Sequence, residues 1–226
     1  MKIGILQTGY APEPVVATSG DYPAMFQRLL DGHGFDFQTW EVVDNQFPGG
    51  PEDADAWLVT GSRHGVYEDH AWIAPLEHLI RAIRDSGKPM VGVCFGHQVI
   101  AQALGGKVEK FDGGWSTGRT TYDMDGQPVA LNAWHQDQVT ERPEGARVLA
   151  SSDFCENAIL AYGDSILTIQ PHPEFTGTVI EGLLTHRAKG VVPDDLIARA
   201  TNDLNQPVDS TAIGLKMAAV LKGEKI

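Results

Sequence analysis

The chain has 226 residues, 42% of them hydrophobic and 21% charged, so it is long enough for one sizeable α/β domain. Its formal net charge of −13 argues against nucleic acid or an anionic membrane surface as a partner. Two cysteines make no disulfide framework, the N-terminal apolar run is too short for a signal peptide, and no window approaches the roughly 18 apolar residues of a membrane span. We therefore expect a cytoplasmic protein.

The first half of the chain predicts strands that alternate with helices. Strands are expected at 3–6, 35–43, 56–60 and 90–93, and helices at 21–30, 74–86 and 96–104. The segment through Pro12 and Pro14 is expected to be a loop, whereas Pro75 fits the first turn of its helix, where a missing N–H does no harm. This alternation predicts βαβ crossovers and a mostly parallel sheet with helices on both faces.

The second half changes character. Between residues 105 and 162, short strand-like runs are separated by Gly, Asp and Pro; they lie at 107–110, 119–124, 128–131, 147–150 and 158–162. We expect them to form an antiparallel extension of the same sheet, followed by a short buried strand at 166–169. Helical patterns broken at Gly190 and Pro207 follow, and apolar residues such as Leu183 and Leu215 predict that these helices cap the domain.

A cysteine ends the expected strand at 90–93, with glycines two residues before it and two residues after it. Gly92 and Gly96 allow a sharp strand-to-helix turn that presents a nucleophile, the geometry described for serine in the G-x-S-x-G elbow. The start of the following helix then favours the thiolate form of Cys94. The alternative is a buried structural cysteine, and hydrophobic periodicity does not separate the two interpretations.

A histidine and a carboxylate follow the buried strand at 166–169. In extended backbone, the side chains of residues i and i+2 point to the same side, so Glu174 can reach the imidazole of His172. Pro171 and Pro173 stiffen this segment. It therefore offers a base for Cys94 and a residue that orients the base, although a plain surface turn explains the same three residues.

An oxyanion that develops on a substrate needs fixed N–H donors. Phe95, at the start of the helix after Cys94, can supply one, and the turn at 60–63 can supply another. The expected strands end at Thr60, Cys94 and Gln170, and sites in open parallel sheets gather at the carboxyl ends of strands. Independent segments thus point to one edge of the sheet.

Several motifs occur in order along the chain. They are Thr60-Gly61-Ser62, Gly92-Val93-Cys94-Phe95-Gly96-His97-Gln98, Leu104-Gly105-Gly106, Trp134-His135-Gln136-Asp137-Gln138-Val139, Arg142-Pro143-Glu144-Gly145-Ala146 leading to Leu149-Ala150-Ser151-Ser152-Asp153, and Gln170-Pro171-His172-Pro173-Glu174. The set resembles a class I (triad) glutamine amidotransferase domain of the type joined to GMP synthetases, and γ-glutamyl peptidases share the motifs. The match runs from about residue 1 to 175. A lone G-x-C-x-G would be weak, whereas the ordered set is specific.

The resemblance implies a flavodoxin-like three-layer α/β sandwich and hydrolysis of a γ-glutamyl amide. Residues 1–226 would form a single domain, with a core at 1–175 and a C-terminal helical segment at 176–226. Cys94 would form a γ-glutamyl thioester, with His172 moving the proton and Glu174 orienting His172. Gly61 and Phe95 would form the oxyanion hole through their backbone N–H groups.

The resemblance also implies a set of substrate contacts. The residues that would hold the glutamine are Ser62, Gln98, Trp134, His135, Gln136 and Asp137. Two positions depart from the family pattern, because Pro171 stands where the family often has Phe and Ser62 replaces the second glycine of the oxyanion turn. Arg63 and His64 at the cleft mouth are expected to be solvated rather than to touch a substrate.

Three functions remain open. The chain is either the glutaminase component of an amidotransferase, acting on glutamine with a separate synthetase subunit, or a free-standing hydrolase of γ-glutamyl peptides. The third possibility is not an enzyme: the chain would be a catalytically silent binding or regulatory module of the same fold. The cysteine-bearing flavodoxin-like chaperone and protease family is excluded by the His-Pro-Glu placed about 80 residues after Cys94. No cofactor is expected, and no metal, because no Cys/His set has the usual zinc-ligand spacing.

Overall fold

A computed structural model describes residues 1–226 and shows eleven strands and seven α-helices. The strands are β1 (Lys2–Leu6), β2 (Asp36–Trp40), β3 (Ala56–Val59), β4 (Met90–Val93), β5 (Lys107–Lys110), β6 (Ser116–Met124), β7 (Gln127–His135), β8 (Asp137–Glu141), β9 (Ala146–Ala150), β10 (Ile159–Tyr162) and β11 (Ile166–Ile169). The helices are α1 (Glu13–Ser19), α2 (Tyr22–Leu29), α3 (Ile73–Asp85), α4 (Phe95–Ala103), α5 (Gly177–His186), α6 (Asp194–Asn202) and α7 (Ser210–Leu221). None of the helices combines the length and the apolar character needed to cross a bilayer.

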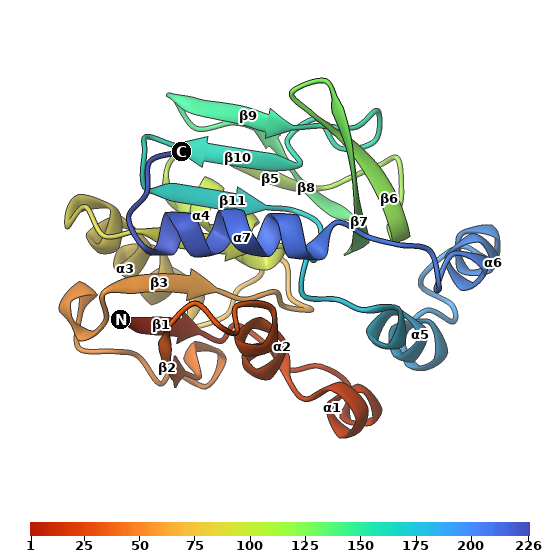
Figure 1. The fold of residues 1–226 in the computed structure, drawn as a ribbon, viewed down its shortest axis with the longest axis horizontal. Helices are drawn as coiled ribbons and strands as arrows, with labels where there is room; N and C mark the ends of the chain where they lie inside the picture. The colour runs from red at the N-terminus through yellow and green to blue at the C-terminus, as the bar shows by residue number, and fades with distance from the viewer.

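The centre of the molecule is a seven-stranded sheet in the order β2-β1-β3-β4-β11-β10-β9 (Figure 1). Strands β2, β1, β3, β4 and β11 are parallel, and β10 and β9 continue the sheet in antiparallel sense. The parallel part has the 2-1-3-4-5 order of flavodoxin-like folds. The predicted fold class is therefore confirmed.

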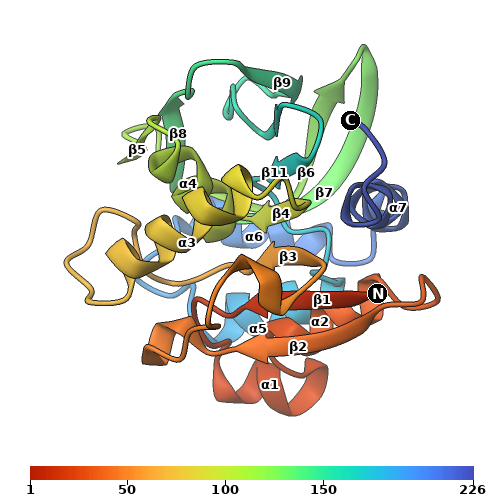
Figure 2. The ribbon, with the colours of Figure 1, turned by 90° about the vertical axis from the view of Figure 1, so that its left-hand side faces the viewer.

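Helices cover both faces of this sheet, as Figure 2 shows with α3 and α4 on one side and α7 on the other. The split follows from strand geometry, because successive side chains of a strand point to opposite faces. In β3, Leu58 belongs to the core beneath α2 and α7, whereas Trp57 and Val59 belong to the core beneath α3 and α4. The continuous apolar runs predicted buried parallel strands. Their alternate side chains pack into two hydrophobic cores, one on each face of the sheet.

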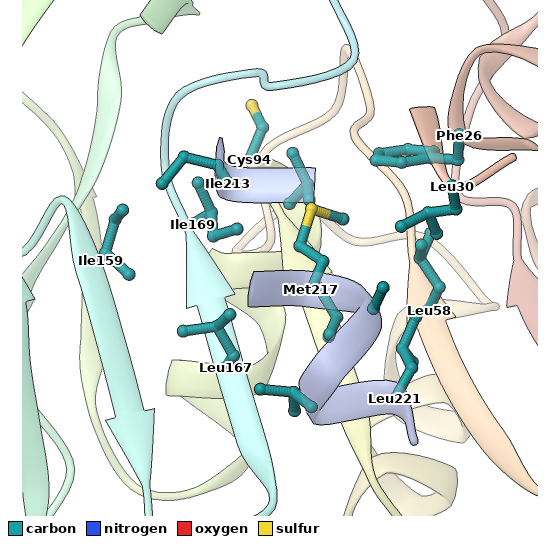
Figure 3. Close-up of a cluster of buried hydrophobic side chains, with 14 of the residues drawn as sticks. Phe26, Leu30, Leu58, Cys94, Ile159, Leu167, Ile169, Ile213, Met217 and Leu221 are labelled. Atoms are coloured by element: carbon teal, nitrogen blue, oxygen red, sulfur yellow. The ribbon is translucent and has the colours of Figure 1, made fainter. Parts of the chain in front are cut away.

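The α7 helix lies across the middle of the sheet (Figure 1). Its residues Ile213, Met217 and Leu221 are buried against strand residues such as Leu167 and Ile169 (Figure 3). Three apolar side chains of this size contribute about 1.5–3 kcal/mol each when fully buried. The predicted capping role of the C-terminal helices is thus met by α7.

Three details differ from the sequence predictions. Residues 13–19 form α1 rather than a loop, because Pro14 lies in the first helical turn, where its missing N–H is tolerated. The predicted antiparallel extension holds for β9 and β10 only, since β5 pairs with β8 and β6 with β7 in two separate two-stranded sheets. Leu215, expected to need cover, is 55% exposed.

A third apolar cluster lies beside the main sheet and joins α1, α5 and α6. It contains Val15, Phe175, Val179 and Leu183, all nearly or fully buried. The α6 helix packs directly on β6, where Gly118 has a φ of +73° and an added Cβ would lie 2.6 Å from Cβ of Ala200. This cluster places α5 next to the carboxyl edge of the central sheet.

Candidate active site

Cys94 lies between the end of β4 and the start of α4. Its φ is +53°, a value that L-residues other than Asn and Asp rarely adopt. The side chain is 6% exposed, and Figure 3 shows its sulfur pointing away from the apolar cluster below it. The cysteine thus occupies the sharp turn that its flanking glycines predict.

Both flanking glycines are required by close packing. An added Cβ at Gly96 would lie 2.2 Å from the carbonyl oxygen of Val59, and one at Gly92 would lie 2.6 Å from the carbonyl oxygen of Gly96. The N–H of Gly96 donates to the carbonyl of Thr60 at 3.1 Å, which ties the start of α4 to the end of β3. The elbow is therefore held by backbone against backbone.

His172 and Glu174 lie in a turn that follows β11. His172 Nδ1 is 2.7 Å from Oε1 of Glu174, and both side chains are almost completely buried. Residues 173–174 form a turn rather than the extended backbone expected, yet the two side chains still meet. The imidazole also stacks on the ring of Phe175, with centroids 3.9 Å apart and planes 5° apart. Glu174 thus fixes the Nδ1 edge of the imidazole, and Phe175 fixes one of its faces.

Electrostatics at this turn favours a protonated imidazole. Burial alone would lower the pKa of His172, but the negative charges of Glu174 and Cys94 outweigh burial and raise that pKa above its usual range. A histidine that holds its proton beside a cysteine stabilises the thiolate, which is the nucleophilic form. The arrangement suits nucleophilic catalysis.

The turn at Gly61 lies between Cys94 and His172. An added Cβ at Gly61 would lie 3.1 Å from Cε1 of His172 and 3.7 Å from Cβ of Cys94. The carbonyl of Gly61 accepts hydrogen bonds from the hydroxyls of Thr8 and Thr60, at 3.0 and 3.1 Å. These bonds hold the turn against the side chains of Cys94 and His172.

A cleft of about 570 Å³ opens over Cys94 and His172. It is lined by every residue that the sequence predicted as a substrate contact, namely Ser62, Gln98, Trp134, His135, Gln136 and Asp137. Gly61, Phe95 and Glu174 are buried next to these lining residues rather than among them. The structure therefore brings together predicted residues from four separate segments of the chain, at 61–62, 94–98, 134–137 and 172–174.

The polar groups of the cleft wall are held by hydrogen bonds. The amide nitrogen of Gln98 donates to the carbonyl of Asp137 at 2.9 Å and to Oε1 of Gln170 at 3.0 Å. Burial raises the pKa of the Asp137 carboxyl, although the hydroxyl of Tyr67, which donates to it at 3.0 Å, opposes this shift. Burial and the nearby His172 lower the pKa of His135 to about 3, so that ring is neutral.

With this geometry established, comparison with known proteins identifies the family. The family model for class-I glutamine amidotransferases matches residues 41–187, which include the elbow, the cleft wall and the His172 turn. This chain is a class-I glutamine amidotransferase family member.

Relatives of two kinds support this amidotransferase assignment. The chain is 34% identical over 179 residues to gamma-glutamyl peptidase 4 of Arabidopsis thaliana, covering 72% of this chain and 71% of that protein. It is 38% identical over 141 residues to the glutamine-hydrolysing GMP synthase of Ralstonia pickettii, covering 55% of this chain but only 25% of that protein. A solved glutamine amidotransferase structure from Methylobacillus flagellatus has the same fold, with a TM-score of 0.79 at 18% identity over 98% of this chain and 92% of that one.

Several residues that line or support the cleft were not predicted from the sequence. Asn132 of β7 accepts the N–H of His172 at 2.8 Å through its carbonyl, and its side-chain amide donates to the carbonyl of Phe175 at 2.8 Å. It therefore binds the turn at both ends. Thr8 was missed in the same way, and so was the apolar wall of Tyr22, Trp115, Phe175 and Leu183. The one available signal was the position of Thr8 just after a buried strand.

Cys155 does not line the cleft that Cys94 lines. It is 2% exposed and lies in the apolar core beneath α7. Burial raises the pKa of its thiol to about 12, so it is protonated at neutral pH. This agrees with the structural role expected for it.

Proposed function

We propose that this protein hydrolyses γ-glutamyl amide bonds through a Cys94–His172–Glu174 triad. The proposal rests on one observation above all, the convergence of Cys94 and His172 on either side of Gly61 with Glu174 fixed to the imidazole. The sulfur of Cys94 attacks the side-chain carbonyl of the glutamyl group and forms a tetrahedral intermediate. His172 gives its proton to the departing nitrogen, and the C–N bond breaks to leave a γ-glutamyl thioester.

Water completes the reaction. His172, now neutral, takes a proton from the attacking water, and the thioester carbon–sulfur bond breaks to release glutamate and regenerate Cys94. Glu174 holds the imidazole with Nδ1 facing the carboxylate, which leaves the other ring nitrogen for proton transfer. Each half of the reaction thus uses the same histidine, first as acid and then as base.

The N–H groups of Gly61 and Phe95 are proposed to bind the oxyanion of both intermediates. Phe95 is the first residue of α4, where helix N–H groups lack partners within the helix and the macrodipole favours negative charge. Gly61 contributes because its backbone packs directly against the nucleophile and the base. A single oxyanion-hole donor is typically worth about 10²–10³ in kcat.

The cleft wall offers groups for the α-amino and α-carboxyl ends of a glutamyl substrate. Both N–H groups of the Gln98 amide already donate within the protein, so the polar atom that remains for a ligand is its oxygen, an acceptor suited to an ammonium. The Asp137 carboxylate at the same wall suits an ammonium as well. Ser62, Trp134, His135 and Gln136 complete the proposed contacts.

Among γ-glutamyl substrates, the cleft favours peptides over free glutamine. Its volume of about 570 Å³ lies within the roughly 300–1,000 Å³ typical of sites for drug-sized ligands, and leaves room beyond one glutamyl group. Arg63, Lys110 and Arg187 line it in a chain whose net charge is −13, which suits a leaving group that carries a carboxylate. The similarity to gamma-glutamyl peptidase 4 supports the same choice.

The second candidate is the glutaminase component of an amidotransferase. The similarity to a glutamine-hydrolysing GMP synthase favours it, and in that case glutamine is the substrate and a separate synthetase subunit receives the ammonia. Both candidates use identical chemistry at Cys94. They differ in whether the protein turns over without a partner.

The deciding experiment assays the purified protein alone against glutamine and a panel of γ-glutamyl peptides. Fast release of glutamate from peptides supports the hydrolase, and slow glutamine turnover that rises when a synthetase is added supports the subunit. Labelling with an electrophilic glutamine analogue, followed by peptide mapping, should place the label on Cys94. Label on a residue other than Cys94 would overturn the proposal, and neither label nor turnover with any substrate would overturn it in favour of the silent module.

A further inference from the structure

Three potential metal ligands meet at the mouth of the cleft, on the segment that follows the Gly61 turn. They are His64, Glu68 and His70, whose ligand atoms all lie within 4.8 Å of one another. Oε2 of Glu68 lies 3.2 Å from Nδ1 of His64 and 2.7 Å from Nε2 of His70. His64 and Glu68 also line the cleft. None of the three takes part in the proposed hydrolysis.

The types of ligand and their separations suit a transition metal. Two imidazole nitrogens and one carboxylate oxygen form the ligand set of many zinc sites, in which water or another group takes the fourth position. In a tetrahedral site with metal–ligand distances of about 2.0–2.2 Å, ligand atoms lie roughly 3.3–3.5 Å apart. The two separations from Glu68 are 3.2 and 2.7 Å, and the separation between the two imidazole nitrogens is at most 4.8 Å. Side-chain rotations that move these atoms by about an ångström therefore bring the three of them to that geometry.

The cluster is held by surroundings other than its own side chains. The rings of His64 and His70 both pack on Trp72, with centroids 5.9 Å away in each case, and Trp72 itself is 4% exposed. The backbone N–H of His64 donates to Oγ of Ser62 at 3.2 Å, and that of Glu68 donates to the carbonyl of Gly65 at 3.1 Å. The ligands are thus partly ordered before any ion binds, which lowers the entropy lost on binding.

The three side chains are partly exposed to solvent. The side chains of Glu68, His70 and His64 are 42%, 34% and 18% exposed. An ion can therefore enter from solvent, and a water can fill the open position. We propose that His64, Glu68 and His70 bind one divalent transition-metal ion, such as Zn²⁺, at the mouth of the cleft.

This site was not predicted from the sequence. The spacing His-x₃-Glu-x-His differs from the usual zinc motifs, which is why the sequence predicted no metal and a solvated His64. The turn at Gly65 and the shared contact with Trp72 bring the three side chains together.

A bound ion would affect the neighbouring catalytic groups through two short connections. One runs along the chain from His64 to Ser62 and Gly61. The other runs through Trp72, whose ring centroid lies 5.3 Å from that of Phe95. Cross-linking residues 64–70 would therefore restrain both segments that are proposed to form the oxyanion hole.

The test measures Zn²⁺ binding by calorimetry on chelator-treated protein. It uses the Cys94→Ser variant as parent, so that the thiol of Cys94 is not a metal ligand. Co²⁺ serves as a second probe, because its visible absorption reports tetrahedral coordination. We expect one ion per chain, and a rise of the thermal unfolding midpoint with added Zn²⁺.

Two added substitutions decide the outcome. His70→Asn should weaken Zn²⁺ binding at least about tenfold and remove the rise in midpoint, since it deletes a ligand. The matched control is His78→Asn, at an exposed position of α3, which should leave both unchanged. Should His70→Asn fold poorly without metal, Glu68→Gln replaces it. Undiminished binding in the folded ligand variant, or no saturable binding in the parent, would overturn the proposal.

Discussion

The two segments that carry the proposed reacting groups are built in different ways. At the elbow, position is set by steric exclusion, because Gly96 packs against the carbonyl of Val59 and leaves no room for a side chain. At the turn after β11, position is set by polar and aromatic contacts, since Glu174, Asn132 and Phe175 each fix one part of the His172 turn.

Because the two segments are held by different kinds of contact, substitutions in them should have different effects. The elbow is local, and any added atom disturbs the packing of β3 against α4. The turn depends on side chains that can be exchanged one at a time with little change in volume. We therefore expect substitutions of the elbow glycines to lower mainly the free energy of unfolding. Substitutions in the turn should change mainly the activity and its dependence on pH.

The largest expected effect lies at Cys94, the one elbow residue that is proposed to react with the substrate. Cys94→Ser should lower kcat/KM for any γ-glutamyl substrate by at least about 10⁴-fold, because the weaker nucleophile forms no thioester. Steady-state kinetics measures this loss, and mass spectrometry of quenched reactions should show the acyl-enzyme in the parent only. A substantially active variant would contradict a thiol nucleophile.

Glu174→Gln tests the chemical side of the turn. The amide keeps the shape of the side chain but loses its charge, so kcat should fall by about 10²–10⁴-fold while the fold is retained. Kinetics and circular dichroism together check this. If kcat changed less than threefold, Glu174 would be a structural residue only.

Gly96→Ala tests the steric side of the elbow. A Cβ placed 2.2 Å from the carbonyl of Val59 should lower the free energy of unfolding by at least about 3 kcal/mol. Urea denaturation measures the change. The matched control is Gly50→Ala, where no heavy atom lies within 4 Å of the added Cβ and the effect should stay within about 1 kcal/mol.

The pH dependence of stability distinguishes the turn further. A histidine whose pKa is raised on folding contributes stability fully below its unfolded pKa, near 6.5, and loses that contribution as pH rises toward the folded pKa of about 10. The free energy of unfolding should therefore fall over this window. In Glu174→Gln the fall should be smaller, by on the order of 2 kcal/mol. Urea titrations at several pH values in both proteins test this, and identical slopes would show that Glu174 does not hold the proton.

The smallest expected effect is at Asn132. Asn132→Ala removes the bond to the carbonyl of Phe175 but keeps the backbone link to His172, so stability should fall by about 1–2 kcal/mol and kcat by roughly tenfold. Asn202→Ala, at an exposed position in α6, is the control and should change neither. A loss confined to stability would mean that the bond supports folding without positioning the base.

The elbow could be predicted from the sequence more fully than the His172 turn. The elbow was predictable because Gly92, Cys94 and Gly96 form a local pattern with one steric meaning. The meeting of Cys94 with His172 followed from parallel strands that end at one edge. Asn132 was not predictable, since it lies within β7 and both its partners are about 40 residues away in sequence. A local pattern does not encode such a contact.

Errors in the fold prediction have equally specific causes. Prolines at 12 and 14 indicated a loop, yet Pro14 lies in the first turn of α1. Short strands between residues 107 and 141 gave no sign of their partners, so two small separate sheets were assigned to the main one. The strand β8 (Asp137–Glu141) was not predicted.

The position of α7 has a consequence for the kinetics of folding. The helix covers β4 and β11, although its residues follow β4 by more than 100 positions in the sequence. Contacts between such distant segments form slowly, because the intervening chain must first be confined. During synthesis, the face of β4 that α7 covers therefore stays uncovered until residues 210–221 have emerged. Until then the growing chain presents a surface that suits a chaperone or a neighbouring nascent chain.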